Sequence, residues 1–228
     1  HSCSMNSVEL INDLAGSARY MMGTQGSATP GSWPYRQLLK KIFNVLESSK
    51  NVEPNEAFDK MLPSLQSLSF YNAEDFWLAG YSSDLAICSL DPNRVNLVNL
   101  RVRQLARVLK AGLDDRVTRD AIQLAHLKSQ SYWAENYTDL YDFCSCLEEQ
   151  CRDDVPAQFA IKSACADVKD ALRDSSAPLV LCSDYYGPAY QFSYGASIYF
   201  PWRSPDALTS VTYQGYRFNE VRNGNGPS

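Results

Sequence analysis

The stretch Leu85-Ala86-Ile87-Cys88-Ser89-Leu90, which ends in Asp91-Pro92-Asn93, decides the fold class of this 228-residue chain. A short, nearly all-apolar run bounded by turn-forming residues is typical of a strand that is buried on both faces. Strands of this kind occur mainly in parallel sheets that are covered by helices on both sides. We therefore expect an α/β fold with a mainly parallel sheet.

Helical periodicity on both sides of this strand supports the same fold class. Apolar residues at helical spacing predict a helix just after Cys3, with Asn6 and Glu9 as its capping box. Two more strands are expected, over Leu179 to Ser183 and over Ser197 to Phe200, with at least one mixed or antiparallel region. Further helices are predicted from Tyr35, around residues 57–65, over Val95 to Leu113, over Val117 to Ser129, from Tyr132 to Gln150 and from Pro156.

The bulk composition is that of an ordinary globular protein. Apolar residues make up 45% of the chain and charged residues 21%, so a single domain over residues 1–228 is expected. The formal charge of -5 argues against nucleic acid as a partner, because phosphate binding needs a basic patch. The longest apolar runs, such as Pro178 to Cys182, are too short for a membrane span. An odd count of seven cysteines leaves at least one thiol without an intrachain disulfide, which slightly favours a cytoplasmic location over export.

The strongest chemical feature is Cys3, which stands directly before the first predicted helix. The positive end of a helix favours the thiolate, which is the nucleophilic form of cysteine. In open α/β sheets, ligands gather beyond the carboxyl ends of strands, where a residue between a strand and a helix would lie. Cys3 is therefore a candidate nucleophile, although most cysteines are structural.

Five segments that extend over most of the chain match one peptidase family in residue type and order. They are Cys3-Ser4-Met5-Asn6-Ser7-Val8-Glu9, Ala18-Arg19-Tyr20-Met21-Met22-Gly23, Pro30-Gly31-Ser32-Trp33-Pro34-Tyr35, Asp139-Leu140-Tyr141-Asp142-Phe143 and Gly195-Ala196-Ser197-Ile198-Tyr199-Phe200-Pro201. In these segments the chain resembles the clostripain-like cysteine peptidases. In that family an Asp-Ala-Cys triplet ends a buried strand, and the resemblance places Cys3 at the position of the catalytic cysteine.

The resemblance implies a caspase-like (caspase-hemoglobinase) fold, in which helices enclose a mainly parallel sheet. This chain would hold the Cys-bearing C-terminal portion, with family-specific helical additions. The resemblance also implies a Cys-His dyad, in which the histidine assists thiolate formation and protonates the leaving amine. The family's histidine precedes the cysteine in sequence, so we expect a companion N-terminal chain or segment, separated by autoproteolysis, that carries it. The expected substrate is a protein or peptide.

The two histidines of the chain have plainer interpretations than that of a dyad base. His126 lies inside a predicted helix and is expected to be a packed or surface residue. His1 is too close in sequence to Cys3 to reach it as a base. In the family, the residue two positions before the cysteine is an acidic group that pairs with a basic P1 residue of the substrate. Because His1 cannot supply a carboxylate there, a neutral or acidic P1 residue fits this chain better than a basic one.

The resemblance also indicates which residues contact the substrate. The loop from Gln25 to Trp33, which helps to wall the pocket in the family, holds no Asp or Glu in this chain. The residues expected to bind the substrate are His1, Ser2, Ser32, Trp33 and Tyr35.

No metal or other cofactor is expected. Cys144, Cys146 and Cys151 lie close together in sequence, but they lack a C-x-x-C pair and a neighbouring histidine. No segment has the spacing of a calcium-binding loop. The remaining cysteines, Cys88, Cys165 and Cys182, are expected to be small core residues.

Two rival classes of protein fit the same sequence. One is a catalytically inactive caspase-like pseudoenzyme or protein-binding regulatory module. The other is an interaction scaffold whose helices dock a partner. The reactivity of Cys3 toward a thiol probe distinguishes the pseudoenzyme from a peptidase, because an activated thiolate reacts much faster than ordinary thiols. Full biological activity of a Cys3→Ala variant would favour the scaffold.

Overall fold

The computed structural model describes residues 4–27, 35–66, 82–132 and 136–201. Its elements, in chain order, are α1 (Val8–Asp13), β1 (Tyr20–Gly23), α2 (Tyr35–Ser48), α3 (Pro54–Gln66), β2 (Ser83–Ser89), α5 (Pro92–Gly112), α6 (Arg116–Lys128), β3 (Ser131–Tyr132), β4 (Tyr137–Asp139), α7 (Leu140–Gln150), α8 (Pro156–Lys169), β5 (Val180–Tyr186) and β6 (Ser197–Tyr199). Helix α8 continues into a π-helical turn, and a short 3-10 turn over Pro188–Tyr190 follows β5.

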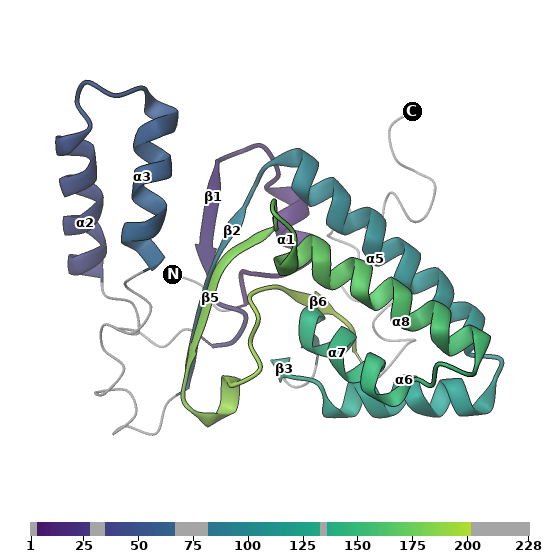
Figure 1. Cartoon of the computed structure of the whole chain (residues 1–228). Coiled ribbons are helices and arrows are strands. Elements are labelled where there is room, and N and C mark those ends of the chain that lie inside the picture. Colours follow the sequence, from purple (N-terminus) through teal and green to yellow (C-terminus); the bar gives the residue numbers. More distant parts are fainter. Residues whose placement is uncertain (1–3, 28–34, 67–81, 133–135, 202–228) are drawn as a thin grey trace.

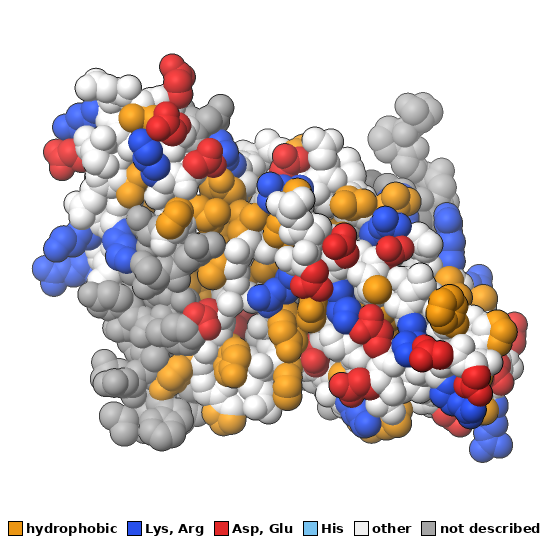
Figure 2. Space-filling view, viewed as in Figure 1, with side chains coloured by type: hydrophobic (Ala, Val, Ile, Leu, Met, Phe, Trp, Pro, Cys, Tyr) orange, Lys and Arg blue, Asp and Glu red, His pale blue; other side chains and the backbone are white. Residues whose placement is uncertain are grey.

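The elements form three layers (Figure 1). A sheet of β1, β2 and β5 lies between the hairpin of α2 and α3 on one side and a larger group of helices, led by α5 and α8, on the other. Charged side chains of both signs cover the outer helices, whereas apolar side chains gather over the sheet between the two helical layers (Figure 2).

Strand β2 contains the run that decided the fold class, and the prediction of a strand buried on both faces is confirmed. Ala86 and Cys88 lie in the main core with α1, α5, α7 and α8. Ile87 points to the other face, where residues of α2 and α3, among them Leu38 and Met61, cover it. The alternation places successive side chains in two different cores, as a pleated strand requires.

The expectation of a mainly parallel sheet is wrong for the residues that the structure describes. Strand β2 pairs antiparallel with β1, where Tyr20 faces Ser89, and antiparallel with β5, where Ser83 faces Tyr186. A second small sheet, in the order β3-β4-β6, is also antiparallel. An apolar run indicates only that both faces of a strand are covered. Here the main core covers one face of β2 and the α2–α3 hairpin covers the other, so burial does not require parallel neighbours. The fold is therefore mixed α/β with small antiparallel sheets.

The helix predicted from Tyr132 to Gln150 begins only at Leu140. The residues before it form β3 and β4, which are two and three residues long. Strands of that length are too short to show an alternating pattern in the sequence. Asp139 ends β4 and caps α7, because its Oδ1 accepts the N–H of Asp142 at 2.8 Å.

Helix α1 follows the predicted nucleophile, but its predicted capping box is wrong. The N-cap residue is Ser7, whose Oγ accepts the N–H of Leu10 at 3.3 Å. The side chains of Asn6 and Glu9 are instead buried and bonded to distant segments of the chain. Asn6 and Glu9 therefore bond to partners distant in sequence and do not form the predicted capping box. Among the described helices, none combines the length and apolar character needed to cross a membrane.

Candidate active site

The residues that follow the predicted nucleophile lie between two other segments. The N–H of Ser4 donates to the carbonyl of Gly26 at 3.1 Å, and the N–H of Asn6 donates to Thr24 at 3.1 Å. On the other side, the N–H of Ser197 donates to the carbonyl of Asn6 at 2.9 Å. Ser4 adopts a left-handed conformation with φ 54°. That conformation costs a non-glycine residue about 1 kcal/mol or more, and such strain is commonly held at functional sites.

The turn that receives Ser4 is fixed by a buried carboxylate. Asp84 Oδ2 accepts the N–H of Gln25 at 2.6 Å, and Asp84 Oδ1 accepts the N–H of Gly26 at 2.9 Å. The ring of Tyr190 covers the same turn, and its hydroxyl accepts the N–H of Ser27 at 3.1 Å. A Cβ on Gly26 would lie 2.4 Å from Cζ of Tyr190, so a larger residue at this position would require the Tyr190 ring to move.

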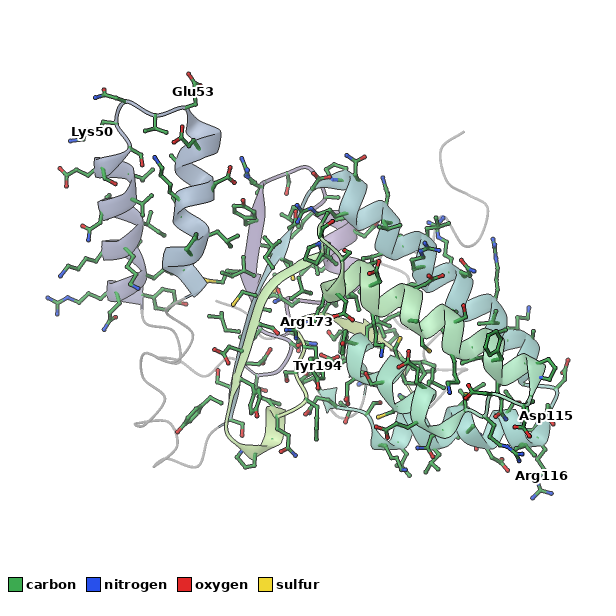
Figure 3. The ribbon with its side chains drawn as sticks, viewed as in Figure 1. Lys50, Glu53, Asp115, Arg116, Arg173 and Tyr194 are labelled. Carbon is green, nitrogen blue, oxygen red and sulfur yellow. The ribbon has the colours of Figure 1, made fainter. Side chains whose placement is uncertain are left out.

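The side chain of Gln25 joins this turn to the second sheet. Its Nε2 donates to Asp139 Oδ2 at 2.8 Å, and its Oε1 accepts the N–H of Gly195 at 2.7 Å. Asp139 Oδ2 also accepts the N–H of Tyr194 at 2.7 Å. Arg173 lies beside Tyr194 where β5 meets the helical layer, with its guanidinium 5.3 Å from the ring centroid (Figure 3). Gln25 thus fixes the spacing of the two segments between which Ser4 to Ser7 runs.

Three buried carboxyl groups surround this arrangement, and burial is the main cause of each pKa shift. The pKa of Asp84 is raised to about 6 and that of Asp139 to about 7. The pKa of Glu9 is also raised to about 7. Glu9 Oε1 accepts the N–H of Tyr199 at 3.0 Å, while its Oε2 is buried without a hydrogen-bond partner. Carboxyl groups with perturbed pKa values are frequent at functional sites, although structural networks produce them as well.

Asn6 connects the same region to the central strand. Its Nδ2 donates to the carbonyl of Gly23 at 3.0 Å and to the carbonyl of Ala86 at 3.3 Å. The side chain is fully buried. The segment behind the predicted nucleophile is therefore attached to β1, β2 and β6 at once.

Most of the predicted site residues lie outside the described residues: His1, Ser2, Cys3, Ser32 and Trp33. Tyr35 is described as the first residue of α2, and its side chain is exposed. The structure therefore describes the residues that follow Cys3 in sequence, and the roles of the predicted site residues stay predictions.

The sequence patterns did not predict the hydrogen bonds of Gln25, Asp84 and Asp139, although Gln25 begins the predicted pocket loop and Asp139 begins one of the family motifs. A weak signal exists for Asp84, because a carboxyl group at the start of an otherwise apolar strand needs a buried partner. Gln25 and Asp139 lie 114 positions apart in sequence, so their contact leaves no local pattern.

His126 and the predicted core cysteines are buried or partly buried in the part of the chain that the structure describes. His126 is buried in α6, with Nε2 3.2 Å from Thr138 Oγ1 and its ring centroid 4.3 Å from that of Phe200, which confirms the expectation of a packed residue. Cys88 and Cys165 are fully buried, as predicted for core cysteines, whereas Cys182 is only partly buried.

A cavity of about 460 Å³ lies at the opposite end of β1 from the turn at Gly26. Arg19, Tyr20, Asp59 and Leu90 are among its lining residues. Because Ser4 bonds to the Gly26 end, this cavity lies at the other end of β1 from the described residues of the candidate site.

Solved structures of C11 cysteine proteases share this fold. An inactive zymogen C11 protease from Parabacteroides distasonis matches with a TM-score of 0.54 at 13% identity, over 96% of this chain and 56% of that chain. A secreted C11 cysteine protease from Bacteroides thetaiotaomicron, in complex with an irreversible peptide inhibitor, matches with a TM-score of 0.54 at 15% identity, over 97% of this chain and 57% of that one. A clostripain from the same species, in complex with a peptide inhibitor, matches with a TM-score of 0.51 at 12% identity. The match covers 93% of this chain and 83% of that chain.

The fold is thus one that solved C11 cysteine proteases share. A sequence model of the clostripain family matches residues 1–187, and the chain belongs to that family of cysteine peptidases. No curated protein matches the chain. The chain spans 56% of the Parabacteroides distasonis protease and 57% of the secreted Bacteroides thetaiotaomicron protease.

Proposed function

We propose that this chain is the Cys-bearing part of a cysteine endopeptidase, with Cys3 as the nucleophile and a companion N-terminal segment that supplies the histidine. The observation that carries the proposal is the anchoring of Ser4, the residue next to Cys3. Its N–H is bonded to Gly26, whose turn is itself held by a buried carboxylate. Family membership supplies the chemistry that this anchoring would serve.

In the proposed reaction, the Cys3 thiolate attacks the carbonyl carbon of a peptide bond. Backbone N–H groups stabilise the negative charge on the carbonyl oxygen. The carbon–nitrogen bond then breaks, and the histidine donates its proton to the leaving amine. Water, deprotonated by the same histidine, attacks the thioester, which releases the acid product and regenerates Cys3.

The environments of the other thiols support Cys3 as the nucleophile. Burial raises the pKa of five cysteines above its ordinary value, so these thiols remain protonated at neutral pH. They are Cys88, Cys144, Cys146, Cys151 and Cys182.

The proposed substrates are peptides whose P1 residue is neutral or acidic. Peptide inhibitors bind two of the similar proteases, which supports a peptide substrate for this chain. His1, Ser2, Ser32, Trp33 and Tyr35 would line the pocket, and His1 offers no carboxylate to a basic P1 side chain.

Hydrolysis of a fluorogenic peptide set that varies only at P1 tests this proposal. The complete protease should hydrolyse neutral or acidic P1 peptides, and Cys3→Ala should abolish that activity. Cys146→Ala is the matched control, because this thiol is only partly buried in α7 and should be dispensable. Mass spectrometry of the same preparation should reveal the companion segment. An active Cys3→Ala variant, or activity without any companion segment, would contradict the proposal.

A further inference from the structure

We propose that Asp84 is a positioning residue for Cys3, acting through the turn at Gln25-Gly26 and the N–H of Ser4. This inference rests on the proposed function, because it assigns Asp84 a role in presenting the nucleophile. Asp84 lies on β2, far from Cys3 in sequence. The link from Asp84 to Ser4, the residue after Cys3, therefore consists of hydrogen bonds through the Gln25-Gly26 turn.

The first step of the connection is the pair of bonds from Asp84 to the turn. Its two carboxylate oxygens accept two successive backbone N–H groups, those of Gln25 at 2.6 Å and Gly26 at 2.9 Å. Bonds to an ionised acceptor are roughly twice as strong as neutral ones. An asparagine could accept only one of the two, because its amide nitrogen would face the other N–H.

The second step is the orientation of the Gly26 carbonyl. The two N–H groups that Asp84 accepts hold the backbone of Gln25 and Gly26 on the side that precedes this carbonyl, whereas the carbonyl itself shares a peptide group with the N–H of Ser27. Tyr190 covers the opposite side of the turn and accepts the N–H of Ser27 at 3.1 Å. The carbonyl of Gly26 accepts the N–H of Ser4 at 3.1 Å and also the hydroxyl of Thr24 at 3.1 Å. That N–H belongs to the peptide group that joins Ser4 to Cys3, so the bond holds the first described residue after the predicted nucleophile.

The third step is energetic. A buried carboxylate is costly because it loses hydration, and burial raises the pKa of Asp84 to about 6 despite its two N–H donors. A simple turn could be held by a neutral side chain at lower cost. The strained conformation of Ser4, with φ 54°, also requires a firm external anchor. A strongly bonded turn opposite a strained residue is the arrangement expected where the position of a neighbouring nucleophile must be exact.

The test compares two variants of the turn with one distant control in the complete protease. Asp84→Asn removes one acceptor from the buried side of the turn, and Tyr190→Phe removes one from its exposed side. Asp115→Ala is the control: Asp115 also accepts a backbone N–H, that of Thr118 at 2.8 Å, but it caps α6 at the outer end of the helical layer (Figure 3). For each protein, kcat and KM on one fluorogenic peptide and the melting temperature are measured.

We expect Asp84→Asn to lower kcat about tenfold or more with a change in KM below about threefold, because small displacements of a reacting group reduce rates strongly. Tyr190→Phe should lower kcat in the same way but less. Asp115→Ala should lower the melting temperature and keep the wild-type kcat.

Two results would overturn the inference: a folded Asp84→Asn variant with wild-type kcat, or an Asp115→Ala variant whose kcat falls as much as that of Asp84→Asn. If Asp84→Asn does not fold, a wild-type kcat for Tyr190→Phe overturns it instead. Loss of the proposed function is distinguishable, because the wild-type protein itself would then hydrolyse no peptide.

Discussion

Glu9 provides a direct test of the buried charges behind the predicted nucleophile. Its carboxyl group is buried in α1, with one oxygen bonded to the N–H of Tyr199 at 3.0 Å and the other without a partner. Burial raises its pKa from the ordinary value of 4.5 to about 7. The folded chain therefore holds a proton on Glu9 in a pH range where the unfolded chain has released it.

This difference makes stability depend on pH in a defined direction. Between pH 4.5 and 7 the folded state binds one more proton at Glu9 than the unfolded state, so the free energy of unfolding falls as pH rises. Each pH unit in that window is worth about 1.4 kcal/mol. Glu9→Gln resembles the protonated side chain and removes the titration. Between pH 4.5 and pH 8, the free energy of unfolding of the variant should therefore rise relative to that of wild type by up to about 3 kcal/mol.

Urea unfolding of both proteins at several pH values measures this gain. Other titrating groups, including Asp84 and Asp139, are present in both proteins and cancel in the difference. Glu47→Gln is the control for the Glu-to-Gln change itself, because the Glu47 side chain is exposed on α2. If the difference in free energy of unfolding between Glu9→Gln and wild type stays constant from pH 4.5 to pH 8, Glu9 does not have a raised pKa in the folded chain.

Three further predictions concern packing and hydrogen bonds near the site. Gly26→Ala should lower the melting temperature because its Cβ would lie 2.4 Å from the ring of Tyr190, and the added change Tyr190→Ala should recover part of the loss; no recovery would show that the contact is not the cause. Asn6→Ala should cost about 2–4 kcal/mol in urea unfolding, because two buried carbonyl groups lose its amide, and a loss below about 0.5 kcal/mol would argue against those bonds. Ile11→Ala should cost about 2–5 kcal/mol because Ile11 is fully buried, whereas Leu39→Ala on the exposed side of α2 should cost little; equal losses would contradict the assigned burial.

The sequence predicted the positions of most elements better than their pairing. The apolar run at Leu85 to Leu90 located β2 correctly, but the same run could not reveal that its neighbours are antiparallel. Burial on both faces depends on the α2–α3 hairpin, which packs on the sheet from a separate part of the chain. Long helices such as α5 were predicted closely because their periodicity extends over many turns.

The candidate site was predictable only in part. The family resemblance predicted Cys3 as the nucleophile from short motifs, and that role stays a prediction, whereas family membership is confirmed. The network of Gln25, Asp84 and Asp139 could not be predicted, because it forms between residues that are distant in sequence and that have ordinary local surroundings. Asn6 and Glu9 show the same effect, since a local capping pattern was overruled by buried tertiary partners.

The most direct test of the central claim is the rate at which Cys3 reacts with iodoacetamide as a function of pH. Peptide mapping of the complete protease by mass spectrometry gives this rate for each of the seven cysteines. If Cys3 is the nucleophile, it should react at least about tenfold faster than the partly buried Cys146 at pH 7, with half-maximal reactivity well below the ordinary thiol pKa of about 8.5. A Cys3 rate equal to that of Cys146, with half-maximal reactivity at or above pH 8.5, would contradict its role as the nucleophile.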